Sequence, residues 1–244
     1  EIEMKIAVIG CSHSDPRCID YQMIEKGPQR KTWVCHVAEN RSDIIIDNYS
    51  FGGHGLQYVD FILKKIVAGS IKYSAVILQL TDTHRTLVPL TDYNDKMQWA
   101  SYYIRENYRS IIKMSPTASV LANSVYAQEQ TEKVISKSWL KENVTGNCFI
   151  DEFVDYFKKS LFLYNNVFDK FYYFSMTGDG EGPNFNNLGI DDKPNAYRYL
   201  NEKYGDSILT DDLHLKDEHS HLVVTDYLQN TELGDLLKYD SIHI

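Results

Sequence analysis

The chain of 244 residues is poor in the features that mark several large protein classes. Its four cysteines (Cys11, Cys18, Cys35 and Cys148) form neither a CxxC pair nor the pattern of a disulfide framework, so we expect a reduced, cytoplasmic environment. No apolar run approaches the roughly 18 residues of a membrane-spanning helix, and no secretory hydrophobic segment is recognisable, so we expect no transmembrane segment. The first residue is Glu1, which is compatible with a processed chain or an excised domain.

Motifs for charged ligands are also missing. The formal net charge is −9 and lysine and arginine form no dense stripe, so we expect no nucleic acid partner. Neither GxGxxG nor GK[ST] occurs, and we expect no cofactor. No HExxH spacing occurs, so we expect no metal. A metallohydrolase is a weaker alternative, because several possible ligands lie close together in sequence: Asp211, His214, Asp217, His219 and His221.

What the chain does contain is an alternation of two patterns. Continuous apolar runs, typical of buried parallel strands, occupy residues 5–10, 43–47, 73–80 and 170–176. Apolar residues at helical spacing predict helices at residues 33–38, 56–67, 94–114, 153–168 and from just after 214 to 227. This alternation predicts a single α/β domain over residues 1–244, with a mainly parallel sheet. We also expect an irregular insertion around residues 115–150 and a long loop around residues 178–194.

Three polar loops follow the first three predicted strands. In α/β sheets of this kind ligands bind outside the carboxyl ends of the strands, so these loops should converge on one rim. The first loop contains Ser12 shortly after Gly10, the second is the Gly-rich segment 48–55, and the third covers residues 81–85. The residues most able to do chemistry therefore lie in these loops.

Ser12, Gly53 and the pair Asp211 and His214 are the candidates for catalysis. A serine after a buried strand can begin a helical turn with its N–H directed at an oxyanion, although such serines are more often caps or turn residues. A carboxylate three residues before a histidine can orient the imidazole as a general base, although this pair is also a common helix start. The glycines around Gly53 let the backbone approach a ligand, although a tight turn alone explains such glycines more often.

The order of these segments resembles that of the SGNH hydrolase (GDSL esterase/lipase) superfamily over nearly the whole chain. The first family block is Gly-Asp-Ser, and the matching residues here are Gly10-Cys11-Ser12. The glycine of the second block looks like Gly53, and the final Asp-x-x-His block looks like Asp211 and His214. Residues 33–38 are similar to the Trp-x-x-x-Leu-Ala segment that often precedes the second block.

The third family block, Gly-x-Asn-Asp, is where the chain departs most from the resemblance. Residues 79–82 read Gln-Leu-Thr-Asp, so Thr81 stands where the family has the asparagine that donates to the oxyanion. Loss of one such donor can lower the rate by about 10²–10³-fold. Either the Thr81 hydroxyl takes over this role, or His84 or Arg85 supplies the donor, or the site is weak or specialised.

The resemblance implies a three-layer α/β/α (flavodoxin-like) fold with a mainly parallel sheet of about five strands. It also implies a serine ester hydrolase in which Ser12 attacks, His214 is the general base and Asp211 orients His214. The oxyanion hole would combine the N–H groups of Ser12 and Gly53 with Thr81, and the reaction would pass through an acyl-enzyme. The polar loops and the acidic charge favour a small or carbohydrate-linked acyl (acetyl) ester as the substrate.

Other assignments stay open on the sequence alone. A sugar O-acyltransferase on the same fold and a catalytically impaired, SGNH-like binding module are the alternatives to hydrolysis. His54, His84 and Arg85 are candidates for substrate binding, although Arg85 is as readily explained by a surface ion pair. His13 is interpreted as a loop or rim residue, because neighbours on a turn usually point apart. Asp212 is the second choice for orienting the catalytic histidine.

Overall fold

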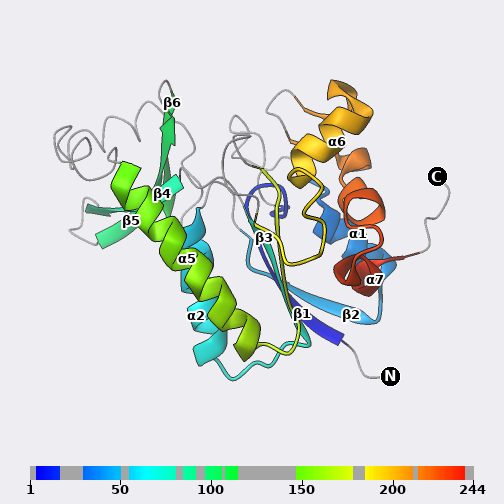
Figure 1. Ribbon diagram of the computed structural model, residues 1–244, viewed down its shortest axis with the longest axis horizontal. Coiled ribbons are helices and arrows are strands. Elements are labelled where there is room, and N and C mark those ends of the chain that lie inside the picture. The colour runs from blue at the N-terminus through cyan, green and yellow to red at the C-terminus, as the bar shows by residue number, and fades with distance from the viewer. Residues whose placement is uncertain are drawn as a thin grey trace.

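The computed structural model of the protein describes residues 4–16, 30–50, 55–80, 85–91, 97–105, 108–114, 147–177, 185–210 and 214–239. For the segments within 85–114 and for residues 147–152, the backbone alone is described. The described segments form a four-stranded sheet with helices against it and a second, three-stranded sheet (Figure 1).

The four-stranded sheet is entirely parallel and is built from the four predicted apolar runs. β1 (Met4–Ile9) pairs with β2 (Ile44–Asn48) on one side and with β3 (Ala75–Leu80) on the other, and β3 pairs with β7 (Phe171–Ser175). The α/β class and the parallel sheet are therefore confirmed, in the order β2-β1-β3-β7. Because the chain runs from β1 to one side and later returns on the other, the carboxyl ends of β1 and β3 border the point where the strand order reverses.

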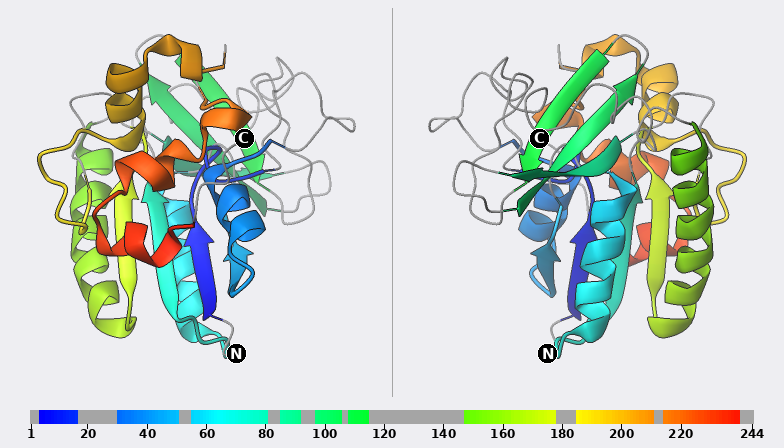
Figure 2. Two further views of the ribbon diagram at one scale, coloured as in Figure 1. Left: turned by 90° about the vertical axis from the view of Figure 1, so that its right-hand side faces the viewer. Right: turned by 90° about the vertical axis from the view of Figure 1, so that its left-hand side faces the viewer.

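One face of this sheet packs against two amphipathic helices, α2 (Leu56–Ala68) and α5 (Asn147–Val167), as Figure 2 shows. Successive residues of a strand point to opposite faces, so Ala7 and Ile9 of β1 turn toward these helices. Burial of one apolar stripe on each helix against the strands holds both helices in place. The residues that meet there include Val59, Ile62, Leu63 and Ile66 of α2, Phe157 and Leu161 of α5, and Val76, Leu78 and Leu80 of β3.

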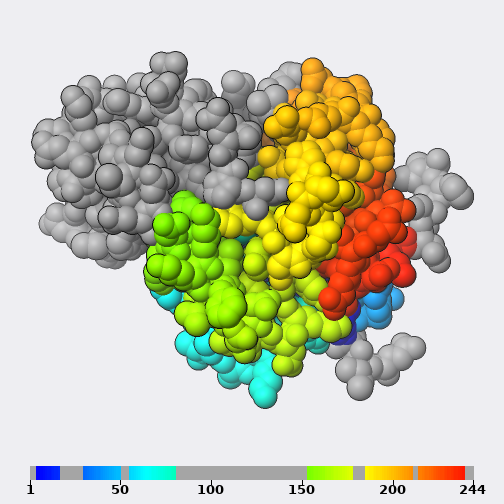
Figure 3. All heavy atoms as spheres, in the orientation of Figure 1, coloured from blue at the N-terminus to red at the C-terminus, as the bar shows by residue number. Residues whose placement is uncertain are grey.

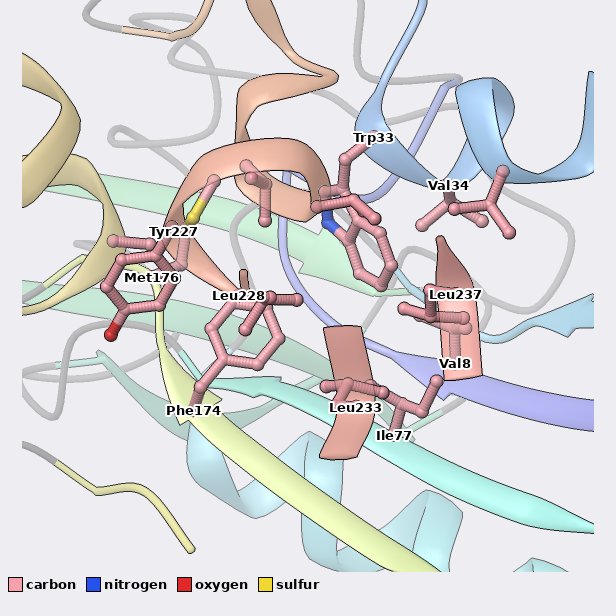
Figure 4. Packing of buried hydrophobic residues seen from close by; sticks show 14 of the residues in the cluster. Val8, Trp33, Val34, Ile77, Phe174, Met176, Tyr227, Leu228, Leu233 and Leu237 are labelled. Carbon is pink, nitrogen blue, oxygen red and sulfur yellow. The ribbon is translucent and has the colours of Figure 1, made fainter. Parts of the chain in front are cut away.

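The opposite face packs against α1 (Trp33–Asn40) and the C-terminal helices α6 (Ala196–Tyr204) and α7 (Glu232–Leu237). Ile6 and Val8 of β1 point to this side and are fully buried. This core joins distant parts of the chain, because its residues come from near both ends of the sequence. Figure 4 shows Val8 and Ile77 of the sheet with Trp33, Val34, Phe174, Met176, Tyr227, Leu228, Leu233 and Leu237.

The outer edge of β7 is covered by an irregular segment instead of by a fifth strand. The Asn187 side chain accepts a hydrogen bond from the Tyr173 N–H (2.8 Å) and donates one to the Phe171 carbonyl oxygen (2.7 Å). Residues 185–194, coloured yellow, lie on the surface between α5 and α7 (Figure 3). These contacts occupy backbone groups that an open edge would offer to another strand. Among the described residues the parallel sheet thus has four strands, not about five.

The helix expected at residues 94–114 is wrong. This stretch contains β5 (Met97–Arg105) and β6 (Tyr108–Met114), which form an antiparallel sheet with β4 (Arg85–Thr91) in the order β4-β5-β6. The apolar spacing that suggested a helix is carried largely by aromatic and β-branched residues, which favour strands. Only two residues separate β5 from β6, as in tight hairpins.

The single helix expected after His214 is replaced by shorter pieces. A 3-10 turn, η2 (Asp217–His219), is followed by a π-helical segment, η3 (Val223–Tyr227), before α7 begins. Between them, the Ser220 hydroxyl donates to the Lys31 carbonyl oxygen (2.7 Å), which ties this segment to the residues before α1. Tertiary hydrogen bonding therefore takes precedence over a continuous helix here.

Parts of the predicted domain plan lie outside the described residues. This applies to the expected insertion up to residue 146, whereas residues 147–150 begin α5. Of the expected loop, residues 185–194 are described; they contain no helix or strand and one isolated bridge, between Asn186 and Phe174. Within the described residues, every helix is too short or too polar to reach across a membrane.

Thr231 caps α7 and gives a measure of how far this helix supports the core. Its hydroxyl accepts a hydrogen bond from the Gly234 N–H (2.9 Å) and donates one to the Leu228 carbonyl oxygen (2.7 Å). Replacing such a cap by alanine costs about 1 kcal/mol. We expect Thr231→Ala to lower the free energy of unfolding by about this amount in urea titrations, while Ser207→Ala, at an exposed position, has little effect. An unchanged midpoint for Thr231→Ala would contradict the capping role.

Candidate functional site

Ser12 lies in a single helical turn at the carboxyl end of β1. The Cys11 carbonyl oxygen accepts hydrogen bonds from the N–H groups of Ser14 (3.0 Å) and Asp15 (3.1 Å), which closes the turn. The first N–H groups of a helical turn have no acceptor within it, and this applies to the Ser12 N–H. Within the described residues no backbone carbonyl accepts a hydrogen bond from it. Ser12 is only 5% exposed, so its hydroxyl is largely shielded from water.

His214 reaches Ser12 from near the other end of the sequence. Its Nε2 lies 2.7 Å from the Ser12 Oγ. At this distance an unprotonated Nε2 accepts a hydrogen bond from the serine hydroxyl and can take its proton when the oxygen attacks an electrophile. Two residues 202 positions apart are thus joined in the geometry of a nucleophile and its general base.

The backbone around His214 is anchored by a pair of hydrogen bonds to Thr210. The Thr210 N–H donates to the His214 carbonyl oxygen (2.8 Å), and the His214 N–H donates to the Thr210 Oγ1 (3.0 Å). Next to them, Leu209 and Leu215 pair as an isolated antiparallel bridge, and both leucines are buried. The histidine is therefore presented by a loop whose two ends are fastened in the core.

His13 lies beside the Ser12 and His214 pair. The ring centroids of His13 and His214 are 4.6 Å apart, with the ring planes tilted by 33°. Tyr197, at the start of α6, makes a T-shaped contact with His13 at 6.3 Å. His13 thus packs against the predicted base and limits the orientations open to the His214 ring, which its interpretation as a rim residue did not anticipate.

Beneath Ser12, the turn is bonded to a buried glutamine of β3. Gln79 is fully buried, and its Oε1 accepts hydrogen bonds from the Ser14 hydroxyl (2.8 Å) and from the Cys11 N–H (3.2 Å). Gly10 leaves room for this amide, since a Cβ at that position would lie 2.8 Å from Oε1. These bonds hold the residues on both sides of Ser12.

Gln79 and Ser14 are site residues that the sequence reasoning missed. In the sequence, Gln79 figures only as the counterpart of a family glycine. The signal that could have identified it is a polar residue within an apolar strand, because a buried amide needs hydrogen-bond partners. Ser14 carries no comparable signal, because serine is ordinary in a turn.

Most of the other predicted site residues lie outside the described part of the chain. These are Gly53, His54, Thr81, His84 and Asp211, together with the second choice, Asp212. Arg85 is the first residue of β4, where the backbone alone is described. Of the predicted triad the structure therefore brings together Ser12 and His214, and the assignments of the oxyanion hole and substrate contacts stay predictions.

The histidines near the C-terminus do not gather into a metal site within the segments that are described. No three His, Cys, Asp or Glu side chains are placed there to share one ion. His36 Nε2 instead donates to the Asp217 carbonyl oxygen (2.9 Å), and the His36 and His221 ring centroids are 5.6 Å apart. These two histidines join α1 to the segment that follows His214.

Comparison of the chain with protein-family models, with curated proteins and with solved structures found no match. The resemblance to SGNH hydrolases therefore rests on the residues of this chain and on their order. To that order the geometry adds the contact between Ser12 and His214 and the placement of both at the carboxyl end of β1.

His221 makes the stability of this region depend on pH. Burial, and then the neighbouring His36, lower the pKa of His221 below its ordinary value. As the pH falls through about 6.5, the unfolded chain therefore binds a proton at this residue before the folded protein does. The stability that neutral His221 contributes is complete above that range and is lost below it, down to the lowered pKa of the folded state.

We expect the free energy of unfolding of the wild-type protein to fall more steeply than that of His221→Gln between about pH 7.5 and about pH 5.5. Urea titrations at a series of pH values measure both slopes. His36→Gln removes one neighbouring charge and should reduce the slope only in part, because burial remains. Equal slopes for the wild type and His221→Gln would contradict the assignment.

Proposed function

We propose that the protein is a serine ester hydrolase of the SGNH (GDSL) type. The observation that carries the proposal is the 2.7 Å contact between Ser12 Oγ and His214 Nε2, directly after β1. In a sheet of order β2-β1-β3-β7 this end of β1 borders the reversal of strand order, where such folds bind ligands. A nucleophile paired with its base at a ligand-binding rim is the arrangement that acyl transfer requires.

The proposal includes the three-layer, flavodoxin-like arrangement that this type of enzyme implies. Two separate buried clusters support it, one containing Ala7 and Ile9 of β1 and the other containing Ile6 and Val8. The first cluster contains residues of α2 and α5, and the second contains residues of α1, α6 and α7. Helices on both sides of the sheet are what a three-layer fold needs.

In the proposed reaction the Ser12 oxygen attacks the carbonyl carbon of an ester while His214 Nε2 takes the hydroxyl proton. The tetrahedral intermediate collapses as His214 returns that proton to the leaving alcohol, which leaves the acyl group on Ser12. Water then attacks the acyl-enzyme with His214 as the base, and the acid is released as Ser12 regains its proton. Asp211 orients the imidazole, a role supported by the hydrogen bonds between its predecessor Thr210 and His214.

The proposed oxyanion hole combines the N–H groups of Ser12 and Gly53 with the Thr81 hydroxyl. The geometry of the turn supports the first donor, because the Ser12 N–H meets no acceptor within that turn. The place of Thr81 in sequence supports the third, because it directly follows β3, the neighbour of β1 in the sheet. Donors arranged in advance around a developing negative charge supply much of the catalysis in such enzymes.

The proposed substrate is a small or carbohydrate-linked acyl ester, such as an acetyl ester. The formal net charge of −9 and the polar loops after the strands favour it over a lipid within a bilayer. A strongly negative protein is repelled by anionic membrane surfaces and gains nothing from them in association rate.

Labelling with a serine-reactive fluorophosphonate tests the nucleophile. We expect wild-type protein to gain the mass of one adduct on the peptide that contains Ser12, and Ser12→Ala to gain none, because only a base-activated hydroxyl reacts at a useful rate. Ser160→Ala is the matched control, since the hydroxyl of this buried serine of α5 donates to the Tyr156 carbonyl oxygen of its own helix, and it should label like the wild type.

Other outcomes of that experiment identify the alternatives. No labelling, together with no turnover of p-nitrophenyl acetate, would favour a binding module over an enzyme. Activity that survives Ser12→Ala and disappears on chelation would point to a metal-dependent hydrolase. Acyl transfer to a sugar acceptor that outpaces hydrolysis would identify an acyltransferase on the same catalytic residues.

His214→Ala tests the general base. We expect it to lower kcat for p-nitrophenyl acetate by about 10³-fold or more, because the Ser12 hydroxyl then keeps its proton during attack. The Tm should stay close to that of the wild type, since His214 is half-buried in a loop that Thr210 still anchors through the backbone. His36→Gln is the control histidine variant and should keep kcat. A kcat for His214→Ala within about threefold of the wild type would exclude His214 as the base.

A further inference from the structure

Four side chains with polar groups are joined by hydrogen bonds around the turn that carries Ser12. One belongs to the turn itself, and the other three come from other parts of the fold. We call them the Ser14 cluster: Ser14 in the turn, Trp33 at the start of α1, Asn48 at the end of β2 and Gln79 in β3. Ser14 and Gln79 are fully buried, and Trp33 is 1% exposed. Buried polar groups such as these need hydrogen-bond partners, because each one has been removed from water.

Ser14 is the centre of this cluster, and its polar groups are all bonded. Its hydroxyl donates to Gln79 Oε1 (2.8 Å) and accepts from Trp33 Nε1 (2.7 Å). Its carbonyl oxygen accepts from Asn48 Nδ2 (2.8 Å), and its N–H donates to the Cys11 carbonyl oxygen (3.0 Å). Bonds from β2, β3 and α1 thus meet at one residue, two positions after Ser12.

Gln79 also bonds the residue on the other side of Ser12. Besides the Ser14 hydroxyl, its Oε1 accepts from the Cys11 N–H (3.2 Å), while its Nε2 donates to the Leu80 carbonyl oxygen (3.1 Å). The residue before Ser12 and the residue two after it are therefore bound to one amide group. Since Gln79 belongs to β3, the turn is held relative to the sheet itself.

The Ser14 cluster bears on the position of the Ser12 Oγ. Ser12 is held between Cys11 and Ser14, and its Oγ lies 2.7 Å from His214 Nε2, a distance that a small shift of the turn would lengthen. A misplacement of about 1 Å at a reacting centre can cost about 10²-fold in rate. Hydrogen bonds in a shielded, low-dielectric setting strengthen one another, so a fully bonded cluster holds its geometry well.

We propose that Ser14 and Gln79 are positioning residues for the nucleophile: through the Ser14 cluster they keep the Ser12 Oγ within hydrogen-bonding distance of His214. This inference rests on the proposed function, because a nucleophile is needed for the positioning to matter. In the proposed role neither side chain touches the substrate. Their loss therefore lowers kcat and the rate of serine labelling and leaves KM nearly unchanged.

Ser14→Ala is the main test, with Thr231→Ala as the matched control. Both variants remove a buried hydroxyl that donates one hydrogen bond and accepts another, but Thr231 lies in the cap of α7. Assays with p-nitrophenyl acetate and the fluorophosphonate run well below both Tm values. We expect Ser14→Ala to lose about tenfold or more in kcat and in labelling rate with KM within about twofold, and Thr231→Ala to keep the wild-type values.

Two further variants separate positioning from general destabilisation. Trp33→Phe removes the N–H that donates to Ser14 and leaves a smaller aromatic ring in the core. Assayed well below its own Tm, it should lower kcat in the same direction by a smaller factor, even if Ser14→Ala folds poorly. The double variant Ser14→Ala with Gln79→Leu should lose less in kcat than the product of the two single losses, because either change alone already removes the hydrogen bond that the two side chains share. If the two single losses in kcat multiply in the double variant, the shared role of Ser14 and Gln79 is contradicted.

The outcomes distinguish this inference from the function beneath it. If wild-type protein is not labelled at Ser12, the proposed function fails and the inference fails with it. If the wild type is labelled and both Ser14→Ala and Trp33→Phe match it in kcat and labelling rate, the inference alone is overturned. If Ser14→Ala and Thr231→Ala lose activity equally, the effect is one of stability and positioning is again excluded.

Discussion

β1 is enclosed on every side, and the rest of the molecule depends on this placement. It pairs with β2 along one edge and with β3 along the other, and it sends Ile6 and Val8 into one core and Ala7 and Ile9 into the other. All four side chains are fully buried, so the strand cannot slide without breaking two hydrogen-bond ladders and both packing layers. The turn that follows β1 therefore has a defined position relative to the ends of β2 and β3.

The polar residues of the candidate site meet at the turn after β1, where the buried apolar residues of that strand end. Gln79 belongs to a strand that is otherwise apolar, and its amide meets the turn after β1 rather than another side chain of the core. His214 arrives at the same turn from a loop whose ends are fastened by Thr210. The Ser12 hydroxyl and the His214 imidazole are held 2.7 Å apart, which is the arrangement that the proposed acyl transfer requires. The reactivity proposed for Ser12 thus depends on the fixed position of β1 in the sheet.

Much of the fold was predictable because burial leaves a strong local pattern. All four parallel strands lie within one or two residues of the apolar runs that predict them, and α1 and α2 begin at the predicted residues. The prediction failed at residues 94–114, where aromatic and β-branched residues happen to recur at helical spacing while their intrinsic preference is for strands. It also failed after His214, where a hydrogen bond from Ser220 to Lys31 and burial of η3 break a regular helix into pieces.

The sequence by itself determined which segments are buried strands and that Ser12 follows the first of them, because a continuous apolar run is stable only inside a sheet or a core. It also set the spacing of Asp211 and His214, from which we predict that the carboxylate orients the imidazole. Only the tertiary structure decided that His214 Nε2 meets Ser12 Oγ, that the tilted His13 ring lies beside that imidazole, and that Gln79 bonds both sides of the turn. Those contacts join residues up to 202 positions apart, and they arise from the packing of β1 between β2 and β3 and of the C-terminal helices against that sheet, which no local pattern encodes.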